Sequence, residues 1–363
     1  ELTVMALFLS NEVIKPLLDT RLIIDALDQA YCQFACGHGV TTPRLDLQAP
    51  LNKSGETYQL GLTAGINEKY AALRIKSDMT FKRTTKSGVT KGKYCGKPGE
   101  YMGLILLFSA FSGELLGIMQ DGLIQRLRVG ADSAIGTRYM ARENASVLGI
   151  LGSGGMARAH LDTICEVRPI EEVRIYSPTV YNREALAEYA RDKGLKAYAV
   201  TSPVNCAASA DILCACTNAV GPVIDENLLS PGMHVTSIGG TVSDSASKRI
   251  DVGLRLGNAT TPSELGNLSF TDECMSYVPV VGKASSGGTP RFVNLSKGQQ
   301  VTLSELLEKR ALGRTDAHQI TFSERGNIHG IQFTAVAAAV YERALAQQAG
   351  QAVDPGFIQN IRN

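Results

Sequence analysis

A glycine-rich segment in the middle of the chain has the residue types and spacing that suit diphosphate binding. It follows the apolar run 146–151 and opens a predicted helix over residues 155–167. Its first glycine permits a tight turn, the next lets the backbone approach a pyrophosphate, and its alanine allows close helix–strand packing. The N–H groups at the helix start would face the phosphates. We therefore predict a dinucleotide site, rather than an unliganded turn, at Gly152, Ser153, Gly154, Gly155, Met156 and Ala157.

The residues after the second predicted strand indicate which dinucleotide is preferred. A site for NAD(H) usually has Asp or Glu there, for the ribose 2′-hydroxyl. The chain has Ser177 and Thr179 instead, with Arg183 just beyond. Hydroxyls and a guanidinium suit a 2′-phosphate, so we expect NADP(H) in preference to NAD(H); Arg183 also fits a solvated position in the next helix. Thr217, which follows a further predicted strand, is another candidate cofactor contact.

These residues need a scaffold that alternates between strand and helix. Such alternation from residue 124 onward predicts a parallel sheet with helices on both faces. Its helices are expected at 124–142, 155–167 and 182–193, and its strands at 146–151, 173–176, 196–200, 211–216 and 233–238. A mostly antiparallel sheet is expected earlier, after a helix over 17–37, with strands at 58–63, 70–76 and 102–109. A long Ala-rich helix follows Gly326.

The bulk composition argues against several classes of partner. The net charge is +1, from 36 basic and 35 acidic residues, which gives no reason to expect nucleic acid. No apolar run approaches the roughly 20 residues of a membrane span, and the first residues lack the basic start of a secretory signal. The eight cysteines form no CxxC pair, and Cys214 and Cys216 are interpreted as buried reduced thiols rather than metal ligands. We expect a cytoplasmic protein without a metal site.

Five segments in a fixed order, at 43–47, 72–78, 98–119, 125–142 and 151–161, resemble the ornithine cyclodeaminase/mu-crystallin family over nearly the whole chain. The family includes cyclodeaminases, alanine dehydrogenase-like enzymes, imine reductases and an NADPH-binding crystallin. The resemblance implies an α/β fold and a homodimer. A Rossmann-type dinucleotide-binding domain is expected at 126–324, and a mixed α+β substrate and dimerisation domain at 1–125 and 325–363.

The resemblance also implies how a carboxylate substrate is bound. Arg44 and Arg128 match family positions that grip the α-carboxylate, and a planar guanidinium suits this by its paired hydrogen bonds. Arg128 also fits a helix-surface position beside Arg126. The walls of the substrate pocket are expected from the loops around 77–97 and 265–290.

A lysine of the family contacts the substrate and assists proton transfer, and the simplest alignment places Arg74 there. Lys76 lies two residues on, hence on the same strand face. Arginine is a poor proton donor, so Lys76 is our candidate catalytic acid and Arg74 the alternative. An ion pair of Lys76 with Asp78 is the competing interpretation.

One departure from the family pattern bears on the reaction. Ornithine cyclodeaminases have an aspartate where this chain has Thr241, with Asp244 three residues on. Threonine is no base at neutral pH, so we predict an NAD(P)H-dependent oxidoreductase that reduces the C=N or C=O of a small 2-imino or 2-oxo acid. Thr241 then remains a substrate contact. The alternatives are an ornithine or lysine cyclodeaminase with tightly bound NAD, and a non-catalytic NADPH-binding protein.

Overall fold

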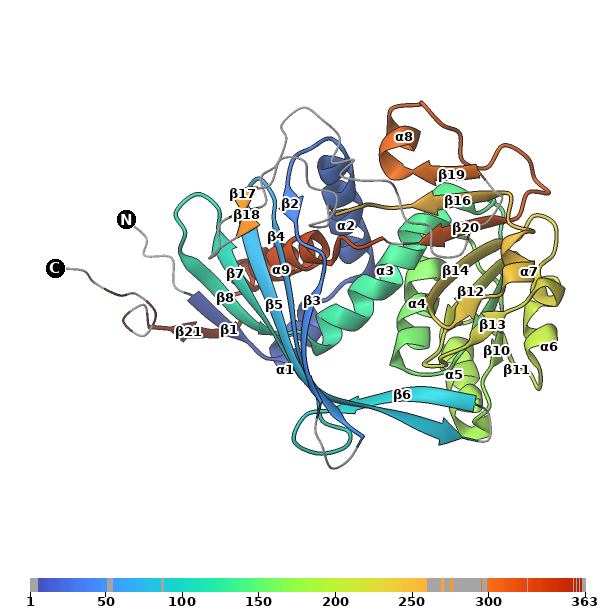
Figure 1. The fold of residues 1–363 in the computed structure, drawn as a ribbon, viewed down its shortest axis with the longest axis horizontal. Helices are drawn as coiled ribbons and strands as arrows, with labels where there is room; N and C mark the ends of the chain where they lie inside the picture. Colours follow the sequence, from blue (N-terminus) through green and yellow to red (C-terminus); the bar gives the residue numbers. More distant parts are fainter. Residues whose placement is uncertain are drawn as a thin grey trace.

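The computed structural model contains two large sheets side by side, with helix α3 (Gly122–Met140) packed between them (Figure 1). It describes residues 6–50, 55–85, 88–259, 269–270, 275–276, 295, 299–324, 326–354, 356, 358 and 360. Over this part of the chain, no helix is long and apolar enough to cross a membrane.

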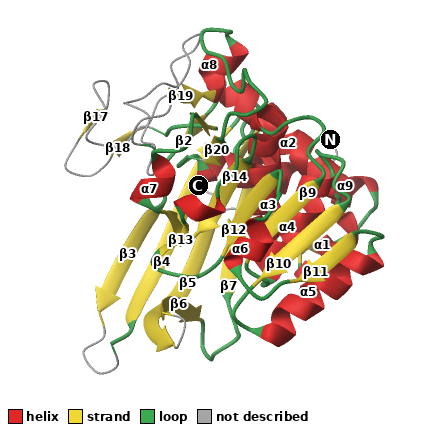
Figure 2. Cartoon of the chain, turned by 90° about the vertical axis from the view of Figure 1, so that its right-hand side faces the viewer, coloured by secondary structure: helices red, strands yellow, loops and turns green. Residues whose placement is uncertain are grey.

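The second half of the chain forms an eight-stranded sheet in the order β11-β10-β9-β12-β14-β20-β16-β19, in which every neighbouring pair of strands is parallel. Figure 2 shows β9 to β12 side by side. The strands are β9 (Val147–Leu151), β10 (Glu172–Tyr176), β11 (Lys196–Ala199), β12 (Ile212–Cys216), β14 (His234–Gly239), β16 (Val252–Arg255), β19 (Gln299–Thr302) and β20 (Thr321–Glu324).

Helices cover both faces of this sheet, as the alternation predicted. Apolar residues of α4 (Gly155–Cys165) and α5 (Val180–Asp192) pack on one face, and those of α6 (Pro203–Ala207) pack on the other. Every helix and strand predicted between residues 124 and 238 is present, with ends shifted by two residues or fewer. The strands β16, β19 and β20 were not predicted.

The first third of the chain forms a nine-stranded sheet, antiparallel except where β1 pairs with β8. Its central order is β2-β4-β5-β7-β8-β1-β21, while β3 pairs with β4 and β6 with β5. The strands are β1 (Ala6–Leu9), β2 (Val40–Thr41), β3 (Leu45–Pro50), β4 (Thr57–Ile66), β5 (Tyr70–Thr85), β6 (Gly88–Tyr94), β7 (Met102–Ser109), β8 (Leu115–Gln120) and β21 (Gln351–Val353). The predicted strand 70–76 was too short, because β5 continues for nine further residues. The domain boundaries at 125 and 325 remain predictions.

Among the residues that the structure describes, helices cover only one face of the nine-stranded sheet. The predicted helix 17–37 is α2 (Thr20–Ala35), which begins three residues later because the Asp19 carboxylate accepts the N–H groups of Arg21 and Leu22 at its start. The helix α1 (Asn11–Leu17) before it was not predicted. The Ala-rich helix α9 (His329–Ala346) packs on β4 and β5. A Cβ on Gly330 would lie 1.8 Å from the Ala64 carbonyl oxygen, so only glycine allows this contact.

Along β4 and β5, the two faces of the nine-stranded sheet have an inverted polarity, whereas on β7 the buried face carries Ile105 and Leu107. The face under α9 carries buried polar side chains, among them Gln59, Thr63, Arg74, Lys76 and Asp78. The opposite face carries half-buried apolar side chains, among them Leu60, Leu62, Leu73, Ile75, Leu104 and Leu106. A sheet exposed to water on one side normally shows the reverse.

The hairpin of β5 and β6 extends beyond the sheet to the loop after β12. The Val220 N–H donates to the Val89 carbonyl (3.1 Å), and the Lys91 N–H donates to the Asn218 carbonyl (3.3 Å). These backbone hydrogen bonds join the two sheets at the end of β12 (Figure 1).

Candidate active site

The predicted glycine turn connects β9 to α4 and is open on its outer side. Gly152 has φ +128°, and a Cβ there would lie 2.1 Å from the Cys216 carbonyl oxygen, so no other residue fits. Gly154 is the N-cap residue of α4, and nothing lies within 4 Å of the position of its missing Cβ. Ala157 is fully buried against the sheet. The turn therefore has room for a phosphate group beside the free N–H groups of the helix.

The residues predicted to select the dinucleotide lie next to this turn. The Ser153 hydroxyl donates to the Ser177 hydroxyl (2.8 Å), and Arg183 donates to the Ser177 carbonyl (3.0 Å). Arg183 is half-buried, which differs from the solvated alternative, whereas Thr179 is exposed at the N-cap of α5. Met156 is half-buried. Three of the predicted residues thus form one group at the end of β10.

A second group of predicted residues lies on the nine-stranded sheet. Strand register places Asp46, Gly61, Lys76 and Gly103 in one row across β3, β4, β5 and β7. A Cβ on Gly61 would lie 2.2 Å from Lys76 Cε, and a Cβ on Gly103 would lie 2.2 Å from the Asp121 carboxylate. The two glycines leave space for the charged side chains beside them, a signal that the sequence alone did not reveal.

Lys76 lies between two carboxylates. Its ammonium is 3.3 Å from Asp78 and 3.6 Å from Asp46, and Lys93 also contacts Asp78 at 3.3 Å. Burial lowers the pKa of Lys76 from its ordinary value, against the opposing effect of the two carboxylates. The ion pair with Asp78, the competing interpretation, is therefore present and opposes loss of the proton, while burial makes the ammonium easier to deprotonate than that of a solvated lysine.

The three predicted arginines differ in their partners. Arg74 is buried and ion-paired with Asp121 (2.6 Å), whereas Arg44 pairs with Asp46 (2.5 Å) and has a half-exposed side chain. Arg128 is 3% exposed, so the interpretation as a helix-surface residue was wrong. It donates to the amide oxygens of Gln332 and of Gln125, the latter at 3.1 Å.

An aromatic ring joins the two buried arginines. The guanidinium carbons of Arg128 and Arg74 lie 4.5 Å and 5.0 Å from the ring centroid of Phe333. Arg44 and Lys76 both pair with Asp46, and Arg74 lies two residues before Lys76 on the same face of β5, so the four predicted cations form one cluster on this side of the sheet. Amide oxygens orient the Arg128 guanidinium without carrying a formal charge themselves.

The sequence profile of the ornithine cyclodeaminase/mu-crystallin family matches residues 76–348 of the chain. The chain belongs to that family. Among its relatives, the Delta(1)-pyrroline-2-carboxylate reductase of Bacillus cereus is 28% identical over 269 residues, which are 73% of this chain and 78% of the relative.

Two solved structures resemble this family member over nearly its whole length. The Delta(1)-pyrroline-2-carboxylate reductase of Thermococcus litoralis, in complex with NADH and L-proline, has a TM-score of 0.72 at 22% identity and covers 96% of this chain and 100% of that one. An archaeal alanine dehydrogenase dimer with bound NAD has a TM-score of 0.73 at 22% identity, covering 96% and 99%. The α/β fold with a Rossmann-type sheet is confirmed.

The remaining predicted residues lie at the ends of β12 and β14. The Thr217 hydroxyl accepts the Ala219 N–H (3.1 Å), and its carbonyl would lie 1.8 Å from a Cβ on Gly239. Thr241 is exposed in β15 (Thr241–Val242), which pairs with β13 (Pro222–Ile224), and Asp244 is exposed at the start of α7 (Asp244–Ser247). Among the described residues, no hydrogen bond or ion pair joins Thr241 or Asp244 to the cationic cluster.

One arginine beside the glycine turn of this family member was not predicted. Arg126 is exposed on α3, and a Cβ on Gly155 would lie 3.4 Å from its Nε. The partners of Arg128, namely Gln125, Gln332 and Phe333, were also missed. A glutamine inside the apolar, Ala-rich run of α9 is the one signal that could have revealed such a contact.

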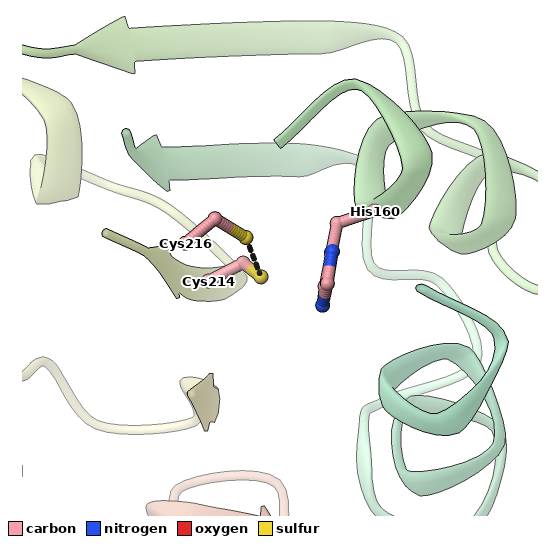
Figure 3. Close-up of side chains that lie close together, drawn as sticks. All are labelled: His160, Cys214 and Cys216. Carbon is pink, nitrogen blue, oxygen red and sulfur yellow. Dashed lines mark hydrogen bonds between the residues drawn. The ribbon is translucent and has the colours of Figure 1, made fainter. Parts of the chain in front are cut away.

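Cys214 and Cys216 share one face of β12, as predicted, and meet His160 of α4 (Figure 3). Their sulfur atoms are 3.3 Å apart, and burial raises the pKa of the Cys216 thiol well above its ordinary value. His160 Nδ1 lies 2.7 Å from the Met156 carbonyl and Nε2 lies 3.0 Å from the Ser133 hydroxyl. The two sulfur atoms and a ring nitrogen of His160 thus lie together in the core, within 4.8 Å of one another.

His234 is equally enclosed, with Thr321 and Ser323 at its two ring nitrogens (3.0 and 3.2 Å), and burial lowers its pKa to about 3. These contacts are those of a hydrogen-bonded structural residue. The predicted pocket wall at 265–290 lies almost wholly outside the described residues. The prediction of a loop at 77–97 was wrong, because most of these residues form the second half of β5 and the strand β6.

The open side of Gly154 can be tested by its substitution to alanine. We expect G154A to unfold at the temperature of the unmodified protein, because its Cβ meets no neighbour, and to bind NADPH and NADH at least about tenfold more weakly, because the methyl group occupies the phosphate position. Thermal unfolding and fluorescence titration measure both. By contrast, G152A should fail to fold. Unchanged nucleotide affinity in G154A would remove the turn from the site.

Proposed function

We propose that the chain is a nicotinamide-dependent reductase that acts on the C=N bond of a small cyclic or acyclic 2-imino acid, or on the C=O bond of a 2-oxo acid. The observation that carries the proposal is the buried Arg128 guanidinium, held by neutral amides within a cationic cluster. A relative named for reduction of pyrroline-2-carboxylate supports the same class of substrate.

The residues at the glycine turn fit a dinucleotide, because Gly154 leaves open space beside the first N–H groups of α4. A nicotinamide bound there supplies a hydride. We propose NADP(H) as the preferred form: Ser153, Ser177 and Arg183 gather at the end of β10, and hydroxyls with a guanidinium suit a 2′-phosphate. Arg126, beside the same turn, has the charge to contact the diphosphate.

The cationic cluster would perform the rest of the reaction. Arg128, assisted by Arg44, binds the carboxylate of the substrate and so orients its α-carbon for hydride transfer. Lys76 donates a proton to the imine nitrogen while the α-carbon receives the hydride, so that a C=N bond becomes CH–NH. Arg74, neutralised by Asp121, keeps the strand and Phe333 in place. Thr241, as a neutral side chain, would contact only the far end of the substrate.

Cyclodeamination has less support, because it needs a carboxylate near the substrate amine and Thr241 takes that position in the alignment. A protein that only stores nucleotide needs no buried carboxylate anchor, and Arg128 argues against it.

The proposal predicts that R128A loses activity and keeps its cofactor. With pyrroline-2-carboxylate and NADPH or NADH, kcat/KM should fall about 100-fold or more, because a buried charge–charge contact is removed. Initial rates from cofactor absorbance measure this, with R21A, an exposed arginine of α2, as the matched control. If R128A turns over like the unmodified protein, or no 2-imino or 2-oxo acid is reduced by either, the proposal fails.

The pH dependence tests Lys76 as the proton donor. A donor must be protonated, so activity is present below its pKa and lost as the pH rises through it; burial places that pKa below 10.5. In K76R the alkaline loss should move to higher pH, since arginine stays protonated, while the maximal rate falls because arginine is a poor acid. An alkaline limb at the same pH in both proteins would assign the proton to another group.

We further propose that two chains pair through the apolar face of the nine-stranded sheet. No helix in the described part of the chain lies over its half-buried leucines and isoleucines, and burial of such a face is favourable. L104K should give a monomer by light scattering, with a lower unfolding temperature than the dimer. L312K, at a 64% exposed leucine outside the sheet, is the control and should stay dimeric. A dimeric L104K would place the interface elsewhere.

A further inference from the structure

Three helices each contribute one buried polar side chain to a hydrogen-bonded group that contacts Arg128. Tyr31 of α2 and Gln332 of α9 are fully buried, and Asp132 of α3 is 2% exposed. The Tyr31 hydroxyl donates to the Asp132 carboxylate, and the Gln332 amide nitrogen donates to both of its oxygens, at 3.3 and 3.1 Å. The amide oxygen of the same Gln332 accepts from Arg128.

The chemistry of the carboxylate fixes which way the Gln332 amide points. A carboxylate accepts hydrogen bonds and donates none, so Asp132 requires the NH₂ end of the amide. The oxygen end then faces the guanidinium, which only donates. If the amide turned over, two donors would face each other at Arg128 and two acceptors at Asp132.

We propose that Asp132, held by Tyr31, is a positioning residue that sets the Gln332 amide and, through it, the orientation of the Arg128 guanidinium toward the substrate's carboxylate. The inference rests on the proposed function, since it assigns a purpose to the anchor named there. Asp132 touches no reacting atom; it acts through Gln332.

The surroundings of Asp132 favour this role over plain core packing. Phe333, next to Gln332 on α9, lies against the Arg128 guanidinium, so two consecutive residues of one helix turn define its plane. Asp132 also lines a small cavity with Thr236 and Ser323, at the carboxyl ends of β14 and β20. That edge of a parallel sheet is where such folds bind their ligands. Asp132 therefore lies between the carboxylate anchor and the nucleotide side of the site.

The substitution D132N tests the proposal, because it keeps the shape of the side chain but replaces one accepting carboxylate oxygen with an amide NH₂ group, which donates. We expect KM for pyrroline-2-carboxylate to rise about tenfold or more, kcat to change less than about threefold, and the Kd of NADPH to stay constant. Binding of pyrrole-2-carboxylate, a flat carboxylate without a reducible C=N bond, should weaken in parallel by calorimetry. Y31F should shift KM the same way by a smaller factor. T137V, a buried hydroxyl one turn further along α3, is the matched control and should leave KM unchanged.

The outcomes separate this inference from the proposed function. If R128A no longer binds the substrate, whereas D132N has the KM and the analogue affinity of the unmodified protein, Asp132 does not position the anchor. A D132N protein with a lower unfolding temperature, a lower kcat and an unchanged KM has lost a structural contact only, which also overturns the inference. If R128A itself binds and reduces the substrate normally, the proposed function fails first. Should D132N not fold, Y31F decides: an unchanged KM in Y31F overturns the inference.

Discussion

The burial of one positive charge, the Arg128 guanidinium, is the constraint on which the arrangement of the nine-stranded sheet and its helices depends. A charge removed from water costs several kcal/mol unless hydrogen bonds and polarisable groups replace the solvent. Here the replacements come from α3 and α9, as amide oxygens and an aromatic face. Helix α9 can supply them only because Gly330 lets it lie directly on β4. The close contact of α9 with β4 therefore also places the groups that bind the Arg128 guanidinium.

Helix α3 links the two candidate sites. Residues two apart on a helix point about 200° away from each other, since each residue turns the chain by about 100°. Arg126 accordingly faces the glycine turn in solvent, whereas Arg128 faces the buried cluster on the nine-stranded sheet. One helix thus sets the separation between the group that holds the nucleotide and the group that anchors the substrate.

The parts of this site that could be predicted are those that depend on residues close together in the sequence. The glycine turn, the strands around it and the shared strand face of Arg74 and Lys76 follow from short-range spacing. The support of Arg128 could not be predicted, because Asp132 meets Tyr31 across 101 residues and Gln332 across 200. Four-residue strands such as β20 carry too little periodicity to be recognised. The polarity of the nine-stranded sheet also escaped, because alternation does not tell which face the helices cover.

The long strand β5 has a structural consequence. Its sixteen residues of extended chain span about 50 Å. Lys76 lies near the middle of this strand, and the hairpin at the strand's far end is held by backbone hydrogen bonds at the loop after β12. The side chain proposed as the proton donor is therefore carried by the same strand whose hairpin contacts the Rossmann-type half of the molecule.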